Sequence, residues 1–503
     1  MKQMYKIAAF ITALLMLFVS GSALAVDDGY STSYTYNYDY WTEVRESPDA
    51  YRVEAVINSA SLGLEKNIKR PQSLFVLNND LYIVDTDNNR IIQTTRKDNE
   101  FKLVRIIDTL KGVEPATLSS PQDVYVDAKE NIYIADTNNQ RVVAVDKDLN
   151  YIKQFVKPTD ATFDQNLSFL PSKIVCDVAG RLYALVTYVN KGLVKFEADT
   201  TFTGFIGANK VTTSMADYIW KAYFQTDAQR AQSEAFVPTE YANIYMDPDG
   251  FIYATTINFK EYDLLYDNAK PIRRLNGVGD DILVKNDRYP PIGDLTWESD
   301  SEAYGPSKLI DVTVLENDIY VAFDRTRGRL FGYDSQGIML WAFGTKGSIQ
   351  GAFTGAVSIE HMGRDLLCLD QRENSITVFT PTEYGNLIYQ AVDEYTQGDY
   401  DKSAETWRQV MKNNSNYSMA FIGIGRSLMR QEKYTEAMEY FEMAHDRDNY
   451  GRAFKYYRKQ WVEQNILWIV ILIGAVVIIP LVIGKAKKMK WEVVMHEHKQ
   501  VNK

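Results

Sequence analysis

The stretch PQDVYVDAKENIYIADTNNQRVVAV, which begins at Pro121, decides the fold of this chain because close variants of it recur at a fixed spacing. PQSLFVLNNDLYIVDTDNNRIIQ starts fifty residues earlier at Pro71, and PSKIVCDVAGRLYALVTYVNKGLVKF starts fifty residues later at Pro171. A constant period of this length is typical of repeat architectures. Since each unit contains several short strand-like runs, the period predicts a β-propeller, whose blades share any functional surface.

Each unit carries a strand followed by a polar turn. Leu81–Val84 and Ile132–Ala135 are β-branched and aromatic runs, and the turns Asp85–Arg90 and Asp136–Arg141 follow them. Asp and Asn suit such turns because their side chains bond back to nearby amides. These residues resemble the NHL repeat, whose pattern runs hydrophobic-Tyr-hydrophobic-Ala-Asp-Thr, then Asn, then Arg and a hydrophobic pair. The third unit departs from the pattern, with Val186–Tyr188 in place of the Asp-Thr turn.

Three further units follow with looser spacing. They begin near Tyr241 and Pro306, and the last contains the strand-like runs of residues 366–379. The fourth and fifth units start late because two insertions precede them, near 205–237, with a helical-looking stretch, and near 257–304, a long mixed loop region. The sequence therefore predicts an all-β propeller of six blades.

A propeller is a ring, and the ring has to hide its last sheet edge. The sixth unit lacks an outer strand, because the sequence turns helical after Phe379. Residues 51–58 are similar to the outer strand Lys102–Asp108 of the first unit. We predict that they complete the sixth blade; the alternative is an ordinary leading strand.

Residues 26–50 form a Tyr-rich leader before the propeller. Tyr34, Tyr36, Tyr38 and Tyr40 alternate, and Trp41 follows. Aromatic residues at a period of two form one face of an extended strand, which would pack on the propeller or on a partner. A flexible leader without such packing is the alternative.

The two ends of the chain predict its location. Residues 1–25 have the pattern of a signal peptide: two lysines, an apolar run, and Ala23-Leu24-Ala25 before the cleavage site. Residues 465–484 are predicted to form a transmembrane helix. Ile466–Gly484 carries no charge and as a helix is about 28 Å long, close to the thickness of a bilayer core. The lysines of the tail 485–503 place that end in the cytosol. We therefore expect a single-pass protein of the cell membrane, with its large domain extracytoplasmic.

Charge and cysteine content limit the partners. The net charge is −11, and because the signal segment 1–25 and the tail from Lys485 are both basic, the portion outside the membrane is more acidic still. An acidic surface repels phosphate backbones, so nucleic acid is not an expected partner. Cys176 and Cys368 lie in strands of the third and sixth units, across the ring from each other, which is too far for a disulfide.

Residues 384–464 change to a helical period. Two copies align at an offset of 34 residues, with the pairs Ala391 and Gly425, Tyr400 and Tyr434, Ser403 and Ala437, Trp407 and Phe441, and Val410 and Ala444. This pattern resembles the tetratricopeptide repeat, in which small residues let paired helices approach and aromatic residues fill the gaps. The resemblance implies a smaller all-α unit that binds peptides or partner proteins. A rigid spacer above the membrane is the alternative.

Motifs for chemistry are sparse in this sequence. The chain has four histidines, of which only His361 lies in the propeller, and the Asp and Asn clusters lie in repeat turns that have a structural role. We assign no catalytic, cofactor-binding or metal-ligating residue and expect no cofactor; the binding residues are unknown.

These patterns favour a membrane-anchored binding or scaffolding protein. The propeller of residues 51–383 and the helical repeats would contact a protein or a glycan without an enzymatic step, as part of an accessory of a membrane transport or envelope complex. The alternative is a cell-surface enzyme of the lactonase- or lyase-like propeller type, which needs a metal site made of oxygen ligands.

Overall fold

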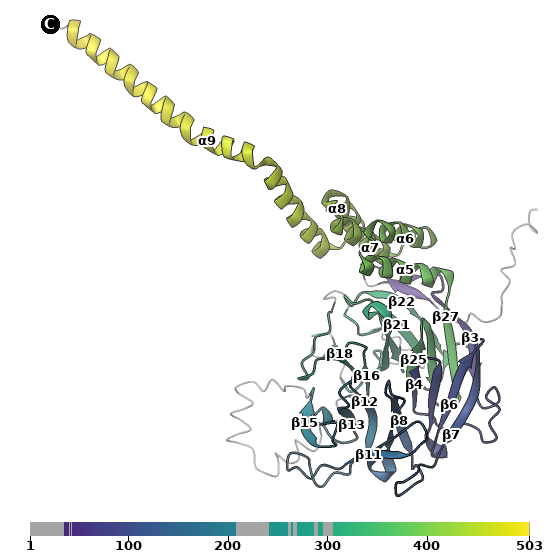
Figure 1. Ribbon diagram of the computed structural model, residues 1–503. Coiled ribbons are helices and arrows are strands. Elements are labelled where there is room, and N and C mark those ends of the chain that lie inside the picture. The colour runs from purple at the N-terminus through teal and green to yellow at the C-terminus, as the bar shows by residue number, and fades with distance from the viewer. Residues whose placement is uncertain are drawn as a thin grey trace, which may run out of the picture. The chain divides into compact units, whose positions relative to one another are not determined.

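A computed structural model describes residues 35–39, 41, 43–207, 241–259, 263–264, 269–285, 290–294 and 305–501. The chain divides into two compact units, Met1–Tyr389 and Gln390–Lys503. The first contains the sheets of a six-bladed β-propeller, and the second is helical (Figure 1). The expected signal peptide, residues 1–25, lies outside the described residues.

The first three blades are four-stranded antiparallel sheets built from consecutive strands. Blade 1 consists of β4 (Ser73–Leu77), β5 (Asp80–Asp85), β6 (Arg90–Lys97) and β7 (Glu100–Ile107). Blade 2 consists of β8 (Pro121–Val126), β9 (Ile132–Asp136), β10 (Arg141–Val145) and β11 (Tyr151–Val156), and blade 3 of β12 (Pro171–Cys176), β13 (Leu182–Val186), β14 (Leu193–Phe196) and β15 (Phe202–Ile206).

The last three blades are less regular. Blade 4 contains β16 (Asn243–Met246), β17 (Ile252–Thr255) and β18 (Ile272–Leu275), and blade 5 is built on β19 (Leu309–Val314), β20 (Tyr320–Asp324), β21 (Arg329–Tyr333) and β22 (Met339–Phe343). Blade 6 contains β25 (Ala356–Met362), β26 (Asp365–Asp370) and β27 (Ser375–Pro381). A short parallel pair, β23 (Thr345–Lys346) and β24 (Ala352–Phe353), connects blades 5 and 6.

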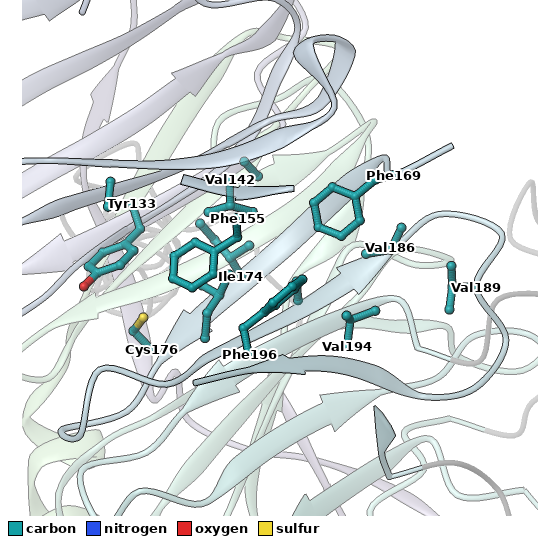
Figure 2. Close-up of a cluster of buried hydrophobic side chains, with 14 of the residues drawn as sticks. Tyr133, Val142, Phe155, Phe169, Ile174, Cys176, Val186, Val189, Val194 and Phe196 are labelled. Atoms are coloured by element: carbon teal, nitrogen blue, oxygen red, sulfur yellow. The ribbon is translucent and has the colours of Figure 1, made fainter. Parts of the chain in front are cut away.

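The first strands of the blades surround a common axis. They contact one another in the order β4, β8, β12, β16, β19, β25 and back to β4. The core lies between neighbouring blades, where apolar faces pack together. Figure 2 shows one such layer, in which Phe155 of blade 2 lies beside Ile174 and Phe196 of blade 3. Burial of each such side chain contributes about 1.5–3 kcal/mol.

The predicted Asp-Thr turns have a structural role. In blade 2 the buried Asp136 carboxylate accepts hydrogen bonds from Arg141 Nε at 2.9 Å and from the Ser119 amide at 2.8 Å. Thr137 Oγ1 donates to the Pro171 carbonyl of blade 3 at 2.7 Å. Asp85 and Thr86 repeat this arrangement in blade 1, with Thr86 Oγ1 bonded to the Pro121 carbonyl. Each turn therefore fixes its own blade and ties it to the next.

The prediction that residues around 51–58 complete the sixth blade is confirmed. Strand β3 (Tyr51–Ile57) pairs antiparallel with β27, from Tyr51 opposite Pro381 to Ile57 opposite Ile376. Val53 and Ile57 are buried while Arg52 and Glu54 are exposed, which is the alternation of a strand with one packed face. The ring is closed by a strand from the beginning of the propeller sequence.

The Tyr-rich leader packs on the propeller where it is described. Strand β1 (Tyr36–Tyr38) pairs with β22 at the outer edge of blade 5, and β2 (Val44–Glu46) pairs with β1. Tyr36 is fully buried and Tyr38 is half-buried, whereas Trp41 is 63% exposed. Tyr34 and Tyr40 lie outside the described residues. The two strands cover an edge that blade 5 would otherwise expose.

A buried ion pair holds the leader in place. The Tyr36 and Tyr38 hydroxyls both donate to Asp294 Oδ1, the first at 2.6 Å, and Arg329 donates to the other oxygen of the same carboxylate. The Arg329 guanidinium also lies over the Tyr36 ring, 5.1 Å from its centre. Burial, together with the Asp294 charge, raises the pKa of both tyrosines well above the ordinary value. Both hydroxyls therefore stay protonated and act as donors.

The two insertions differ from the expectation in one respect. The region 257–304 is not only a loop, because it supplies β18, the third strand of blade 4, which pairs with β17 from Ile252 opposite Leu275 to Thr255 opposite Ile272. Its sequence, IRRL, has too few apolar residues to stand out as a strand, and pairing with β17 decides it. The helical-looking stretch of the insertion 205–237 lies outside the described residues.

The helical region follows the last strand directly. It contains α5 (Glu383–Gln397), α6 (Tyr400–Asn413), α7 (Ser418–Arg430), α8 (Tyr434–Met443) and α9 (Arg447–Val501). The first turns of α5 pack on the propeller, where Tyr389 Oη lies 2.5 Å from Tyr51 Oη. The aligned tyrosines 400 and 434 are the first residues of α6 and α8. That these helices are tetratricopeptide-like repeats stays a prediction.

One described helix is long and apolar enough to cross a membrane. Within α9 an 18-residue window has a mean hydropathy of 3.3, and none of it is buried in the protein. The predicted span 465–484 lies inside this helix, and Pro480 does not interrupt it. The orientation across a membrane stays a prediction.

Both cysteines are buried and unpaired, as their positions in β12 and β26 indicated. Burial raises the pKa of the Cys176 thiol to about 12 and that of Cys368 well above its ordinary value, so neither is a reactive thiolate.

Candidate functional site

A ring of equivalent side chains surrounds the propeller axis. Each blade contributes one, from the same place near the start of its first strand: Ser73, Asp123, Lys173, Asn243, Asp311 and Ser358. We call these six residues the axial ring. Five of them are buried, and the Lys173 side chain is only 12% exposed. The sequence analysis did not single them out. In the three regular units, however, the ring residue stands two positions after the proline that starts the unit, at 71, 121 and 171.

One half of the axial ring is a connected set of polar contacts. Ser73 Oγ donates to Asp123 Oδ1 at 2.6 Å and accepts a hydrogen bond from Lys173 Nζ at 2.9 Å. The Lys173 ammonium lies 3.9 Å from the same carboxylate oxygen. Asp123 Oδ2 accepts the backbone amide of Ile174, which belongs to the next blade. The Asp123 carboxylate thus links three consecutive blades.

The other half repeats the link between blades. Asp311 Oδ2 accepts the Ile359 amide of blade 6 at 2.8 Å, and Ser358 Oγ accepts the Leu74 amide of blade 1 at 3.3 Å. The second contact crosses the junction where the ring closes. Buried amides need such partners, because an unmade hydrogen bond at a buried group costs about 1–3 kcal/mol. The axial ring therefore contributes to assembly of the propeller.

Burial of charge dominates the electrostatics at the axis. It raises the pKa of Asp311 to about 6, raises that of Asp123, and raises that of Glu360 in β25 well above its ordinary value. Lys173 is the cation that acts on all three carboxyls and lowers their pKa values. Three acids thus share one buried ammonium group. The negative charge that this group does not balance can be reduced by protonation of the acids, because their pKa values are raised.

His361, the histidine that the sequence places in the propeller, follows Glu360 in β25. Its Nδ1 is 2.7 Å from Thr313 Oγ1 in β19, so the imidazole joins blades 5 and 6. Burial lowers its pKa to about 4, and it is neutral near pH 7.

The enzyme alternative requires carboxylates at metal-binding spacing. Within the described residues one group brings its oxygens within 4.8 Å of one another: Asp247, Asp249 and Asp318. Arg274 bridges all three, at 2.6 Å from Asp247 and 3.2 Å from each of the others. The guanidinium supplies the positive charge that an ion would bring. The axial carboxyls do not reach that spacing among the described residues.

The geometry defines a six-bladed β-propeller with a polar axial ring, followed by a helical region with one apolar helix. The family model of the NHL repeat matches residues 118–145, which contain β8, β9 and β10 of blade 2. No match was found among the curated proteins.

Several solved structures are similar to the propeller at low identity. Virginiamycin B lyase from Staphylococcus aureus is 10% identical, with 65% of this chain and 98% of that chain covered and a TM-score of 0.36. A protein of unknown function from Bacteroides thetaiotaomicron is 12% identical, with 70% and 76% covered and a TM-score of 0.39. A putative exported protein from Bacteroides fragilis is 13% identical, with 63% and 91% covered and a TM-score of 0.36. Likeness of this extent carries no inference about ligand or reaction.

Proposed function

We propose that this protein is a membrane-anchored, extracytoplasmic binding and scaffolding protein that serves as an accessory of a membrane transport or envelope complex. In this proposal α5 to α8 are two tetratricopeptide-like repeats that dock a protein of the complex. The propeller presents a face to a second protein or to a glycan, residues 466–484 cross the cell membrane, and the tail 485–503 is cytosolic.

The observation that carries the proposal is that α7 packs closely on both α6 and α8, through two glycines that face aromatic residues. Gly423 of α7 lies against Trp407 of α6, so close that an added Cβ would be 2.4 Å from the indole nitrogen. Gly425 lies in the same way against Phe441 of α8, where an added Cβ would be 2.6 Å from the ring. Trp407 and Phe441 are equivalent residues at the offset of 34. Stacked helices with close glycine-on-aromatic packing support the proposal that they bind a peptide or protein partner.

The axial ring supports the same proposal from the propeller side. Its carboxylates accept backbone amides of neighbouring blades, and its lysine is held by Ser73. These polar groups join blades to one another. We therefore place the binding function on the other surfaces of the propeller.

Site-specific photocrosslinking in native membranes tests the docking role. A photoreactive amino acid replaces half-exposed Phe421 or Ile422 of α7, or exposed Gln409 of α6, in the full-length chain. We expect adducts with a membrane protein from at least one of these positions. The adducts should disappear when Gly423→Val forces α6 and α7 apart, and should persist in the exposed control Lys412→Ala. Absence of adducts from all three positions would refute docking through these helices.

The enzyme alternative keeps one observation in its favour, the group of Asp247, Asp249 and Asp318. If this group holds calcium, added calcium should raise the melting temperature, and Asp249→Asn should remove the effect. Because Arg274 bridges the three carboxylates, we expect no calcium-dependent shift in the natural protein. A shift that depends on Asp249 would favour the alternative.

A further inference from the structure

The first part of α9, between α8 and the apolar run, has three distinct faces. One face packs on α8, where Ala453 is fully buried and the Tyr456 ring stacks on Tyr434 at 5.7 Å. A second face is basic and carries Arg452, Lys455 and Lys459. Successive residues of a helix are rotated by about 100° around its axis, and this rotation leaves a third face between the first two.

This third face is aromatic, and none of the described residues covers it. It consists of Tyr450, Phe454, Tyr457 and Trp461, which we call the aromatic seam. Tyr450 is 38%, Phe454 46% and Trp461 49% exposed, and Tyr457 is half-buried. The Phe454 and Tyr457 rings lie 6.5 Å apart on the helix surface. Four large aromatic side chains in a row are a costly surface to leave in water.

The spacing of the aromatic seam is that of a helix–helix contact. Its members are separated by four, three and four residues, the pattern that keeps one face against a partner helix. After Gln464 the same spacing continues in the apolar run as Trp468, Ile471, Ala475, Ile478 and Val482. A partner that follows the whole row must itself be a helix that leaves the membrane and continues alongside α9.

Lipid does not account for the aromatic seam. Tyr450 precedes Ile466 by sixteen residues, about 24 Å along the helix, whereas the headgroup layer on one side of a bilayer is about 5–8 Å thick. Trp461 alone lies near enough to serve as an interfacial anchor. Charge limits how the helices can pair: Arg452, Lys455 and Lys459 point away from the seam, and the exposed Arg458 lies at its edge, so a like helix must pack on the aromatic side chains with the two Arg458 side chains extending to solvent.

We propose that the aromatic seam pairs with the aromatic seam of a second copy of this chain, in a parallel two-helix contact that continues into the membrane. A second copy meets the geometric requirement directly, since it presents the same row of residues along a helix of the same direction. A parallel pair of this kind is two-fold symmetric, with each residue facing its own equivalent or the next one. This inference shares only the membrane crossing with the proposed function.

Cysteine crosslinking of the full-length chain in membranes tests the pairing. The two natural cysteines are buried, so a single introduced cysteine reports on its own position. Phe454→Cys and Tyr457→Cys lie on the seam, and Lys455→Cys and Lys459→Cys are matched controls on the basic face. Under mild oxidation we expect disulfide-linked dimers at 454 and 457 at a yield at least fivefold above that at 455 and 459. Equal yields at all four positions, or no dimer at 454 and 457, would overturn the proposal.

A second measurement guards against a local effect of the cysteines. Phe454→Lys combined with Trp461→Lys places like charges across the seam, and mass photometry in nanodiscs should then show monomers where the unchanged chain shows dimers. Persistence of the dimer in this variant, or a monomeric unchanged chain, would overturn the pairing. Carbonate extraction of the same membranes reports separately whether α9 anchors the chain, so failure of the pairing and failure of the membrane anchor are distinguishable.

Discussion

Charge balance at the propeller axis depends on Lys173. Its ammonium group is the cation that acts on Asp123, Asp311 and Glu360, and it also donates to Ser73. Buried carboxylates that lose their cation are left with the full cost of desolvation, which in comparable pairs amounts to about 3–5 kcal/mol. This residue comes from the third blade, whose repeat sequence is the most divergent of the regular three.

Lys173→Met should therefore lower the free energy of unfolding by about 3–5 kcal/mol at pH 7. The loss should be smaller at pH 5, because the carboxyls have raised pKa values and become neutral more readily. Chemical denaturation of the two proteins at both pH values measures the effect. The exposed control Lys129→Met should change stability by less than about 0.5 kcal/mol. A loss that is equal at both pH values would contradict this account.

Asp311 and His361 should give opposite pH dependences of stability. Burial raises the pKa of Asp311 to about 6, so its contribution to stability is present below its ordinary pKa of 3.8 and is lost as pH rises through 6. Burial lowers the pKa of His361 to about 4, so its contribution is present above 6.5 and is lost as pH falls through 4. The two effects occupy the same pH range and offset each other.

If either group is removed, the contribution of the other to the pH dependence of stability should become visible between pH 4 and 7. Relative to the unchanged protein, Asp311→Asn should gain stability as pH rises, by at most about 3 kcal/mol. His361→Asn, which keeps an acceptor for Thr313, should gain stability as pH falls. Parallel pH profiles for the two variants would contradict the assigned directions.

At the scale of elements, the leader strands β1 and β2 complete blade 5. Backbone pairing of β1 with β22 is brief, with Tyr36 opposite Ala342, so the side chains carry the attachment. The Asp294 carboxylate accepts from two tyrosine hydroxyls of β1 and from Arg329 of β21, so three distant parts of the chain meet there. The leader is therefore held by a polar cluster and not by a long ladder.

The double variant Tyr36→Phe, Tyr38→Phe should detach the leader without unfolding the propeller. Each hydroxyl donates to a carboxylate, and such a hydrogen bond contributes about 1.5–3 kcal/mol. Hydrogen exchange should become faster at residues 36–38 and along β22, with little change in β4 to β11. Trp41→Phe serves as the control, because that side chain is mostly exposed. Unchanged exchange at β1 and β22 in the double variant would show that the backbone ladder suffices.

At the scale of the whole molecule, the apolar part of α9 is long and apolar enough to cross a membrane. Its 18-residue window has a mean hydropathy of 3.3 and no burial within the protein, so water would have to solvate the entire surface if no membrane did. Transfer of that surface to hydrocarbon is strongly favourable.

A chain that ends after Gln464 should therefore leave the membrane fraction, whereas a chain lacking only residues 485–503 should stay in it. Carbonate extraction followed by immunoblotting measures the distribution. The second truncation is the control for damage to the C-terminus in general. Retention of the shorter chain in the membrane would mean that another part of the protein holds it there.

Much of the architecture could be read from the sequence, because its signals are local and repeat. The fifty-residue period, the Asp-Thr turns and the closing strand β3 depend on patterns that each segment carries by itself, and the structure confirms the six blades and the closure. The apolar run of α9 is likewise a property of consecutive residues, independent of what surrounds it.

Only the tertiary structure decided the axial ring, the attachment of the leader and the position of β18. Ser73, Asp123 and Lys173 are fifty residues apart and meet because three blades converge on one axis. Asp294 reaches Tyr36 across 258 residues, and IRRL is a strand because β17 offers it a free edge. Each of these three features depends on which distant segments become neighbours, and that cannot be derived from local patterns in a single sequence. Periodicity along the chain thus determined the propeller, and the closing of the ring determined which buried charges meet.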